Sequence, residues 1–273
     1  MASGASTPAA DDTGSAFDAS GVPLRVVTAA SLFDGHDAAI NVMRRLIQAA
    51  GCEVIHLGHD RSALDVVKAA IEEDAHAIAI TSYQGGHMEY FTYIRELLNA
   101  AGREDIRIFG GGGGTITPPE IRDLHASGIT RIYSPDDGRQ MGLLGMIDDL
   151  VKQASECDLL AQNIGLDAPV TPDQREKVAR LISIAENADA VTFAQALKMC
   201  RSRPMETRVP VIGFTGTGGA GKSSLLDELM RRIITQNPHL NVAILCTDPT
   251  RKRTGGALLG DRIRMNTLVS DRL

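Results

Sequence analysis

The stretch LRVVTAASLFDGHDAA, residues 24–39, contains the pattern that organises this 273-residue chain. Its first seven residues are apolar except for Arg25 and Thr28, and three of them are β-branched, which predicts a buried strand. The polar residues Asp34, His36 and Asp37 follow the strand, and a helical pattern begins near residue 37. Either these residues form a solvated loop with a helix cap, or His36 is held out as a ligand with the Asp34 carboxylate behind it.

Four similar units follow, and each pairs an apolar run with a helical pattern. The expected strands and helices are EVIHL (53–57) with 62–73, AIAITS (77–82) with 88–101, RIFGG (107–111) with 118–126, and RIYS (131–134) with 138–154. Five such units predict an α/β fold, a parallel sheet with helices on both faces. Ligands bind such sheets at the carboxyl ends of the strands. Three segments that follow strand ends are therefore candidates: SLFDGHDAA (31–39), TSYQGGH (81–87) and GGGGGT (110–115).

Composition limits the function classes. The net charge is -6 and the pI is near 5.6, so neither nucleic acid nor an anionic membrane is an expected partner. No run approaches the roughly 18 apolar residues that a membrane span needs. The four cysteines form no CxxC pair, which argues against a zinc knuckle or a disulfide framework. Residues 1–21 carry no apolar signal segment, and we expect a disordered tail in a cytoplasmic protein.

A second unit is expected after the first domain. Residues 22–154 would form that domain, and residues 155–207 a helical linker with Asp173 as a helix cap. The remaining segment, 208–273, opens with the predicted strand VPVIGFT (209–215). A helix near 222–235 and a strand VAILCT (242–247) would follow it.

The segment GTGGAGKS, residues 216–223, matches the phosphate-loop pattern GxxxxGK[ST] between a predicted strand and a predicted helix. Its backbone N–H groups and the helix N-terminus would surround a phosphate, Lys222 would add the catalytic positive charge, and Ser223 would bind Mg²⁺. A glycine-rich turn that only caps a helix is the alternative. The residues expected to bind nucleotide are Gly218, Gly219, Ala220, Gly221, Lys222, Ser223 and Ser224.

The segment TDPTRKRTGGALLGDRIRM (247–265) resembles the corresponding segment of G proteins that act as chaperones of cobalamin-dependent mutases. This resemblance implies GTP rather than ATP, Asp248 and Asp261 beside Ser223 as Mg²⁺ ligands, and Arg264 near the nucleotide. The chain ends at Leu273, before a guanine-selecting NKxD segment. We therefore expect the first part of a P-loop GTPase domain.

The motifs of residues 24–154 resemble the DxHxxG…SxL…GG pattern of cobalamin-binding domains. DGH (34–36), SYQ (82–84) and the glycines at 110–114 supply its parts, with departures at Ala39 and Gln84. The resemblance implies a Rossmann-like, flavodoxin-like domain in which His36 ligates cobalt from below and the cofactor's nucleotide tail enters a slot. An imidazole nitrogen suits cobalt and needs an acceptor such as Asp34 behind it. The residues expected at the cofactor are His36, Asp34, Gly35, Ser82, Gly111 and Gly112.

A cobalamin domain joined to a chaperone G domain resembles the fused isobutyryl-CoA mutases. That family implies an adenosylcobalamin-dependent isomerase that interconverts isobutyryl-CoA and n-butyryl-CoA, with GTP hydrolysis gating cofactor loading. It also implies an acyl-CoA site on a downstream domain absent here, and a homodimer. The alternative is a cobalamin carrier or sensor whose G domain serves a separate mutase such as methylmalonyl-CoA mutase. A dinucleotide site at residues 110–114 is disfavoured, because the glycine run follows the fourth strand and lacks GxGxxG.

Overall fold

The computed structural model describes residues 16–161, 170–171, 174–201, 209–217 and 219–245. Five parallel strands form one sheet in the order β2-β1-β3-β4-β5, which confirms the flavodoxin-like prediction. The order reverses between β1 and β3, and ligand sites of such sheets lie at that point. The strands are β1 (Arg25–Ser31), β2 (Glu53–Arg61), β3 (Ala77–Thr81), β4 (Arg107–Gly111) and β5 (Arg131–Tyr133).

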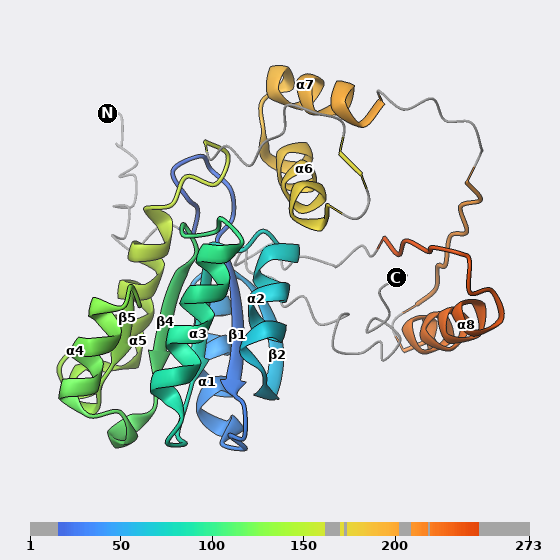
Figure 1. Ribbon diagram of the computed structural model, residues 1–273. Helices are drawn as coiled ribbons and strands as arrows, with labels where there is room; N and C mark the ends of the chain where they lie inside the picture. The colour runs from blue at the N-terminus through green and yellow to red at the C-terminus, as the bar shows by residue number, and fades with distance from the viewer. Residues whose placement is uncertain (1–15, 162–169, 172–173, 202–208, 218, 246–273) are drawn as a thin grey trace, which may run out of the picture.

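Helices cover both faces of the sheet (Figure 1). One face carries α1 (Asp37–Ala49) and α5 (Pro135–Ser155), and the other carries α2 (Ala63–Glu72), α3 (His87–Ala100) and α4 (Pro118–Ala126), with a short 3-10 turn at Gly113–Thr115 before α4. Strand alternation divides the core accordingly, because successive side chains point to opposite faces. Ile78 and Ile80 of β3 belong to the larger cluster, whereas Ala77 and Ala79 belong to the cluster beside α1 and α5.

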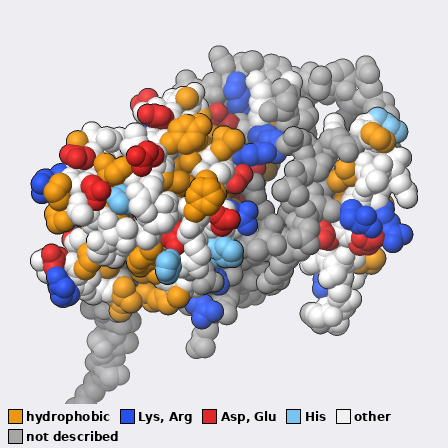
Figure 2. Space-filling view, turned by 60° about the horizontal axis from the view of Figure 1, so that its bottom comes forward, with side chains coloured by type: hydrophobic (Ala, Val, Ile, Leu, Met, Phe, Trp, Pro, Cys, Tyr) orange, Lys and Arg blue, Asp and Glu red, His pale blue; other side chains and the backbone are white. Residues whose placement is uncertain are grey.

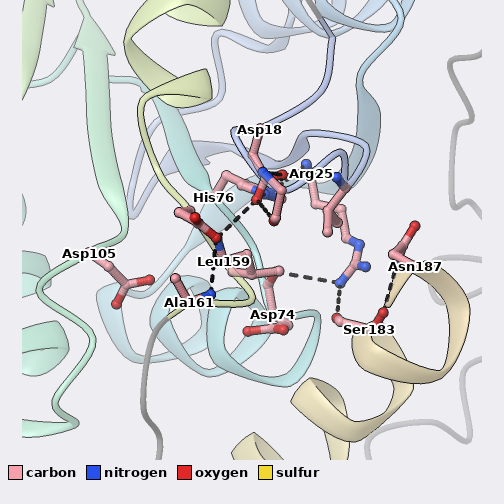
Figure 3. A network of polar contacts seen from close by, with 12 residues as sticks. Asp18, Arg25, Asp74, His76, Asp105, Leu159, Ala161, Ser183 and Asn187 are labelled. Atoms are coloured by element: carbon pink, nitrogen blue, oxygen red, sulfur yellow. Dashed lines mark hydrogen bonds and ion pairs between the residues drawn. The ribbon is translucent and has the colours of Figure 1, made fainter. Parts of the chain in front are cut away.

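The predicted N-terminal tail is too long, because its last part belongs to the fold. Asp18 is buried, and its carboxylate accepts hydrogen bonds from the backbone N–H groups of Val22 at 2.8 Å and Leu159 at 2.9 Å. The same carboxylate lies 3.3 Å from Nε2 of the buried His76 (Figure 3). These contacts tie residues 16–21 to the sheet, while residues 1–15 lie outside the described part of the chain.

The helical prediction for the middle of the chain is confirmed in the described residues by α6 (Arg175–Asn187) and α7 (Ala190–Arg201). The predicted cap Asp173 lies outside them. The helix α8 (Lys222–Gln236) is also formed, but the predicted strands at 209–215 and, as far as it is described, 242–247 are not. Val211 and Leu245 are 93% and 98% exposed, and a strand without paired neighbours or a buried face is not stable. Among the described residues, no helix is long and apolar enough to cross a bilayer.

Candidate functional site

The loop after β1 holds a histidine against a buried carboxylate. Asp34 is 1% exposed, and its Oδ1 accepts the backbone N–H of His36 at 2.9 Å and lies 2.8 Å from Nδ1 of the same residue. Its Oδ2 accepts the backbone N–H of Tyr83 at 2.6 Å. The His36 side chain is 74% exposed. Because Nδ1 faces the carboxylate, this network assigns the Nε2 lone pair to the outward side of the ring.

Asp34 is suited to this role by its ionisation. Burial alone would raise the pKa of Asp34, but hydrogen bonds from the backbone of Tyr83 and from His36 outweigh burial and lower the pKa below its ordinary value. The carboxylate is therefore charged at neutral pH and fixes the tautomer and the direction of the imidazole.

Two residues in the left-handed backbone region brace the same loop. Phe33 has a φ of 63° and Asp60, at the end of β2, has a φ of 56°. The backbone N–H of Phe33 donates to the Asp60 carboxylate at 2.7 Å. Such conformations cost free energy outside glycine and persist where the surroundings fix them, often at functional sites. Hydrophobic side chains and histidines are exposed together on this face of the molecule (Figure 2).

A cavity of about 420 Å³ lies next to the histidine loop, between α1, α5 and the carboxyl ends of β3, β4 and β5. Its walls are mainly apolar and include Ile40, Met43, Phe109, Tyr133, Leu143 and Met146. Tyr83 joins the two features, because it lines the cavity and its ring centroid lies 5.5 Å from that of His36. The exposed imidazole and the cavity therefore form one site.

Glycine at the end of β4 is required by a close approach of two strands. A Cβ atom on Gly112 would lie 1.9 Å from the carbonyl oxygen of Ser82. Gly111 and Gly112, two of the positions expected at the cofactor, both line the cavity. A Cβ atom on Gly35 would meet open space, so packing in the described protein does not require glycine there.

Thr81 lies on the cavity wall, whereas the predicted residue Ser82 does not. The Ser82 hydroxyl is fully buried, accepts a hydrogen bond from Ser31 at 2.9 Å, and Ser82 does not line the cavity. Thr81 lines it, and its buried Oγ1 has no hydrogen-bond partner within the described part of the structure. The alternation of side chains along β3 could have indicated Thr81 from the sequence. Ala77, Ala79 and Thr81 are two residues apart, so all three point to the face of the sheet that α1 and α5 cover.

The phosphate loop is formed in part. Gly219 and Gly221 adopt φ values of 77° and 81°, and Gly221 precedes the first turn of α8, which begins with Lys222. The Lys222 ammonium donates to the carbonyl oxygens of Gly216 at 2.9 Å and Thr217 at 2.8 Å. Ala220 lies in the loop, and Ser223 and Ser224 follow in the first helical turn. The other predicted nucleotide and Mg²⁺ residues, Gly218, Asp248, Asp261 and Arg264, lie outside the described residues. Within the described ranges, no group of three or more His, Cys, Asp or Glu side chains is placed to hold a metal ion.

Comparison with known proteins agrees with this geometry. Residues 24–137 match the family model described as B12 binding domain. This part of the chain is a B12 binding domain. Residues 178–272 match the model described as Methylmalonyl Co-A mutase-associated GTPase MeaB, so the B12 binding domain is followed by a GTPase-family segment that begins within α6.

Curated relatives extend the similarity over nine-tenths of the chain. The fused isobutyryl-CoA mutase of Geobacillus kaustophilus is 52% identical over 92% of this chain and 23% of its own length. That of Cupriavidus metallidurans is 53% identical over 90% of this chain and 22% of its own length. The chain thus spans about a quarter of the length of these relatives. A solved cobalamin-binding protein from Desulfitobacterium hafniense is 20% identical and covers 50% of this chain and 59% of its own, with a TM-score of 0.39, too low to add to the argument.

Proposed function

We propose that the chain binds cobalamin with His36 as the lower axial ligand to cobalt and with the displaced nucleotide tail in the 420 Å³ cavity. The observation that carries this proposal is the exposed imidazole, backed by the buried Asp34 carboxylate and adjoining that cavity. The residues present fit the group. An imidazole nitrogen is a suitable cobalt donor, apolar walls suit a heterocycle, and the unpartnered Thr81 hydroxyl can bond to a polar ring atom of the tail.

Each residue has a separate task in this proposal. His36 would hold the metal, while Asp34 holds the imidazole in one tautomer and the backbone of Tyr83 holds Asp34. Gly111 and Gly112 line the cavity that would hold the tail. The Ser82 hydroxyl is engaged by the hydroxyl of Ser31. Thr81 would therefore make the hydrogen bond to the tail that was expected of Ser82.

We further propose that the intact protein is an adenosylcobalamin-dependent mutase that interconverts isobutyryl-CoA and n-butyryl-CoA in the cytoplasm. The similarity to fused isobutyryl-CoA mutases supports this activity. Bound adenosylcobalamin would supply radical chemistry, and a further domain would bind the acyl-CoA. The GTPase-family segment would bind GTP and Mg²⁺ through Lys222, Ser223, Asp248, Asp261 and Arg264. The homodimer stays a prediction. Mutase turnover by these 273 residues alone would contradict this division of tasks.

Electron paramagnetic resonance of Co(II) cobalamin bound to the chain tests the ligand directly. With ¹⁵N-labelled histidine, the superhyperfine splitting should change in the wild type and in a His59→Ala control, which removes another exposed histidine. The change should vanish in His36→Ala. A splitting that ignores the label in the wild type would show that the cofactor keeps its own base, and the proposal would fail.

A further inference from the structure

The helix α6 belongs to the GTPase-family segment but packs against the B12 binding domain. The match to the GTPase family begins at residue 178, inside α6, yet α6 packs against α2 of the B12 binding domain. Figure 1 shows α6 beside the amino ends of the strands, the edge opposite to the one that carries the His36 loop. The first helix of the GTPase-family segment is therefore seated on the neighbouring domain.

A buried ion pair fixes this contact. The Arg180 guanidinium makes two parallel contacts to Asp74, Nε to Oδ2 at 2.8 Å and Nη2 to Oδ1 at 3.1 Å. Both side chains are at most 1% exposed. Arg103 lies 3.3 Å from the same carboxylate and is itself held by Asp105. Burial would raise the pKa of Asp74, but Arg180 and then Arg103 outweigh it and hold the pKa below its ordinary value.

Further contacts surround the pair. Arg25, at the start of β1, donates to the Ser183 hydroxyl of α6 at 2.8 Å and to the carbonyl oxygen of Glu73 at 3.0 Å (Figure 3). At the rim, Arg175 of α6 lies 2.7 Å from Glu72 of α2. The B12 binding domain thus presents the buried Asp74 carboxylate and the buried Arg25 guanidinium, and α6 presents the matching Arg180 and Ser183.

The polar contacts define the orientation of α6 more strongly than its apolar contacts do. Its buried apolar side chains are small or medium in size, Ala179 and Ile184. Burying an ion pair costs desolvation, so such a pair contributes specificity of geometry more readily than net stability. A two-point arginine–carboxylate contact permits one relative orientation of the helix and the domain.

We propose that α6 is the docking helix that holds the GTPase-family segment to the B12 binding domain, with Asp74 as its receptor carboxylate. The surface around Asp74 fits a helix that carries an arginine with a serine three residues later. This proposal is independent of cobalamin ligation by His36, which takes place at the other edge of the sheet.

Hydrogen exchange of the full chain, followed by mass spectrometry, tests the docking. In Arg180→Leu, the protection factors of the α6 amides should fall at least about a hundredfold, because the buried Asp74 carboxylate loses its two-point partner and keeps the longer contact to Arg103. Peptides of β3 and β4 should keep theirs. Arg231→Leu is the matched control, since Arg231 makes the same two-point contact to Glu228 but on the exposed surface of α8.

Two results would overturn the proposal. Unchanged α6 protection in Arg180→Leu would show that the Asp74–Arg180 pair does not hold the helix. An equal loss of protection in every strand would show that the pair stabilises the whole fold rather than the docking of α6. The milder variant Ser183→Ala guards against a failure to fold and should lower α6 protection only about fivefold. Cobalamin affinity, measured on the same samples, should stay at the wild-type value, so failure of the docking and failure of the cofactor site are distinguishable.

Discussion

Replacing Gly112 with alanine should destabilise the B12 binding domain by a steric effect alone. The added methyl carbon would lie 1.9 Å from the carbonyl oxygen of Ser82 and 3.0 Å from its carbonyl carbon. The φ of Gly112 is -155°, outside the left-handed region that favours glycine, so the expected effect comes from this close contact. The two strand ends cannot separate freely, because the backbone N–H of Ser82 donates to the carbonyl oxygen of Gly111 at 2.8 Å.

The size of the effect follows from these contacts. Overpacking of this kind costs roughly 1–3 kcal/mol, and loss of the strand hydrogen bond adds about 1 kcal/mol. We expect the free energy of unfolding to fall by about 2–4 kcal/mol, a large share of a typical domain's stability. Urea unfolding followed by circular dichroism measures it, with Gly114→Ala as the control because a Cβ atom there meets open space. Equal unfolding midpoints for the two variants would refute the reasoning.

Four further predictions concern the proposed cobalamin site, the contact between Asp74 and α6, and the phosphate loop. Asp34→Ala removes the acceptor of His36 and Tyr83 and should lower cobalamin affinity about 10- to 100-fold in an absorbance titration; wild-type affinity would contradict the role given to Asp34. Thr81→Val should weaken cobalamin binding about tenfold but leave binding of cobinamide, which lacks the heterocycle, unchanged. Because the pKa values of Asp34 and Asp74 are lowered in the fold, their stabilisation is present above the unfolded pKa of about 4 and is lost as pH falls through the folded values. The melting temperature should therefore hold from pH 7 to pH 5 and fall below about pH 4, less steeply in Asp74→Asn. Lys222→Ala should abolish nucleotide binding without shifting the melting temperature, since the ammonium contacts only loop carbonyls.

The strands and helices of the first domain could be predicted from the sequence because each depends on a local pattern of apolar and polar residues. The predicted helix at 138–154 begins earlier, at Pro135, because Ser134 and Asp137 form a capping box. Ser134 and Pro135 are themselves readable start signals. The interruption at Gly142, where φ is 68°, was not predicted.

Other features depend on partners that a single sequence does not identify. The motif pattern indicated Ser82, whereas strand alternation, read through Ala77 and Ala79, indicates Thr81. The Asp74–Arg180 pair joins residues 106 positions apart, and nothing local to either residue predicts the other. The apolar runs after residue 208 were read as strands from composition, but strands form only beside neighbours.

The parallel sheet separates the two functional regions and also connects them. All carboxyl ends share one edge, which places Asp34 after β1 and Thr81 at the end of β3 beside the proposed cobalamin site. The amino ends share the opposite edge, where α6 binds Arg25 at the start of β1 and Asp74 just before β3. The exposed His36 side chain therefore lies at the edge of the sheet opposite to the one that α6 contacts. The same two strands, β1 and β3, are thus contacted by α6 or by its partner Asp74 at one edge and lead into the proposed cobalamin site at the other.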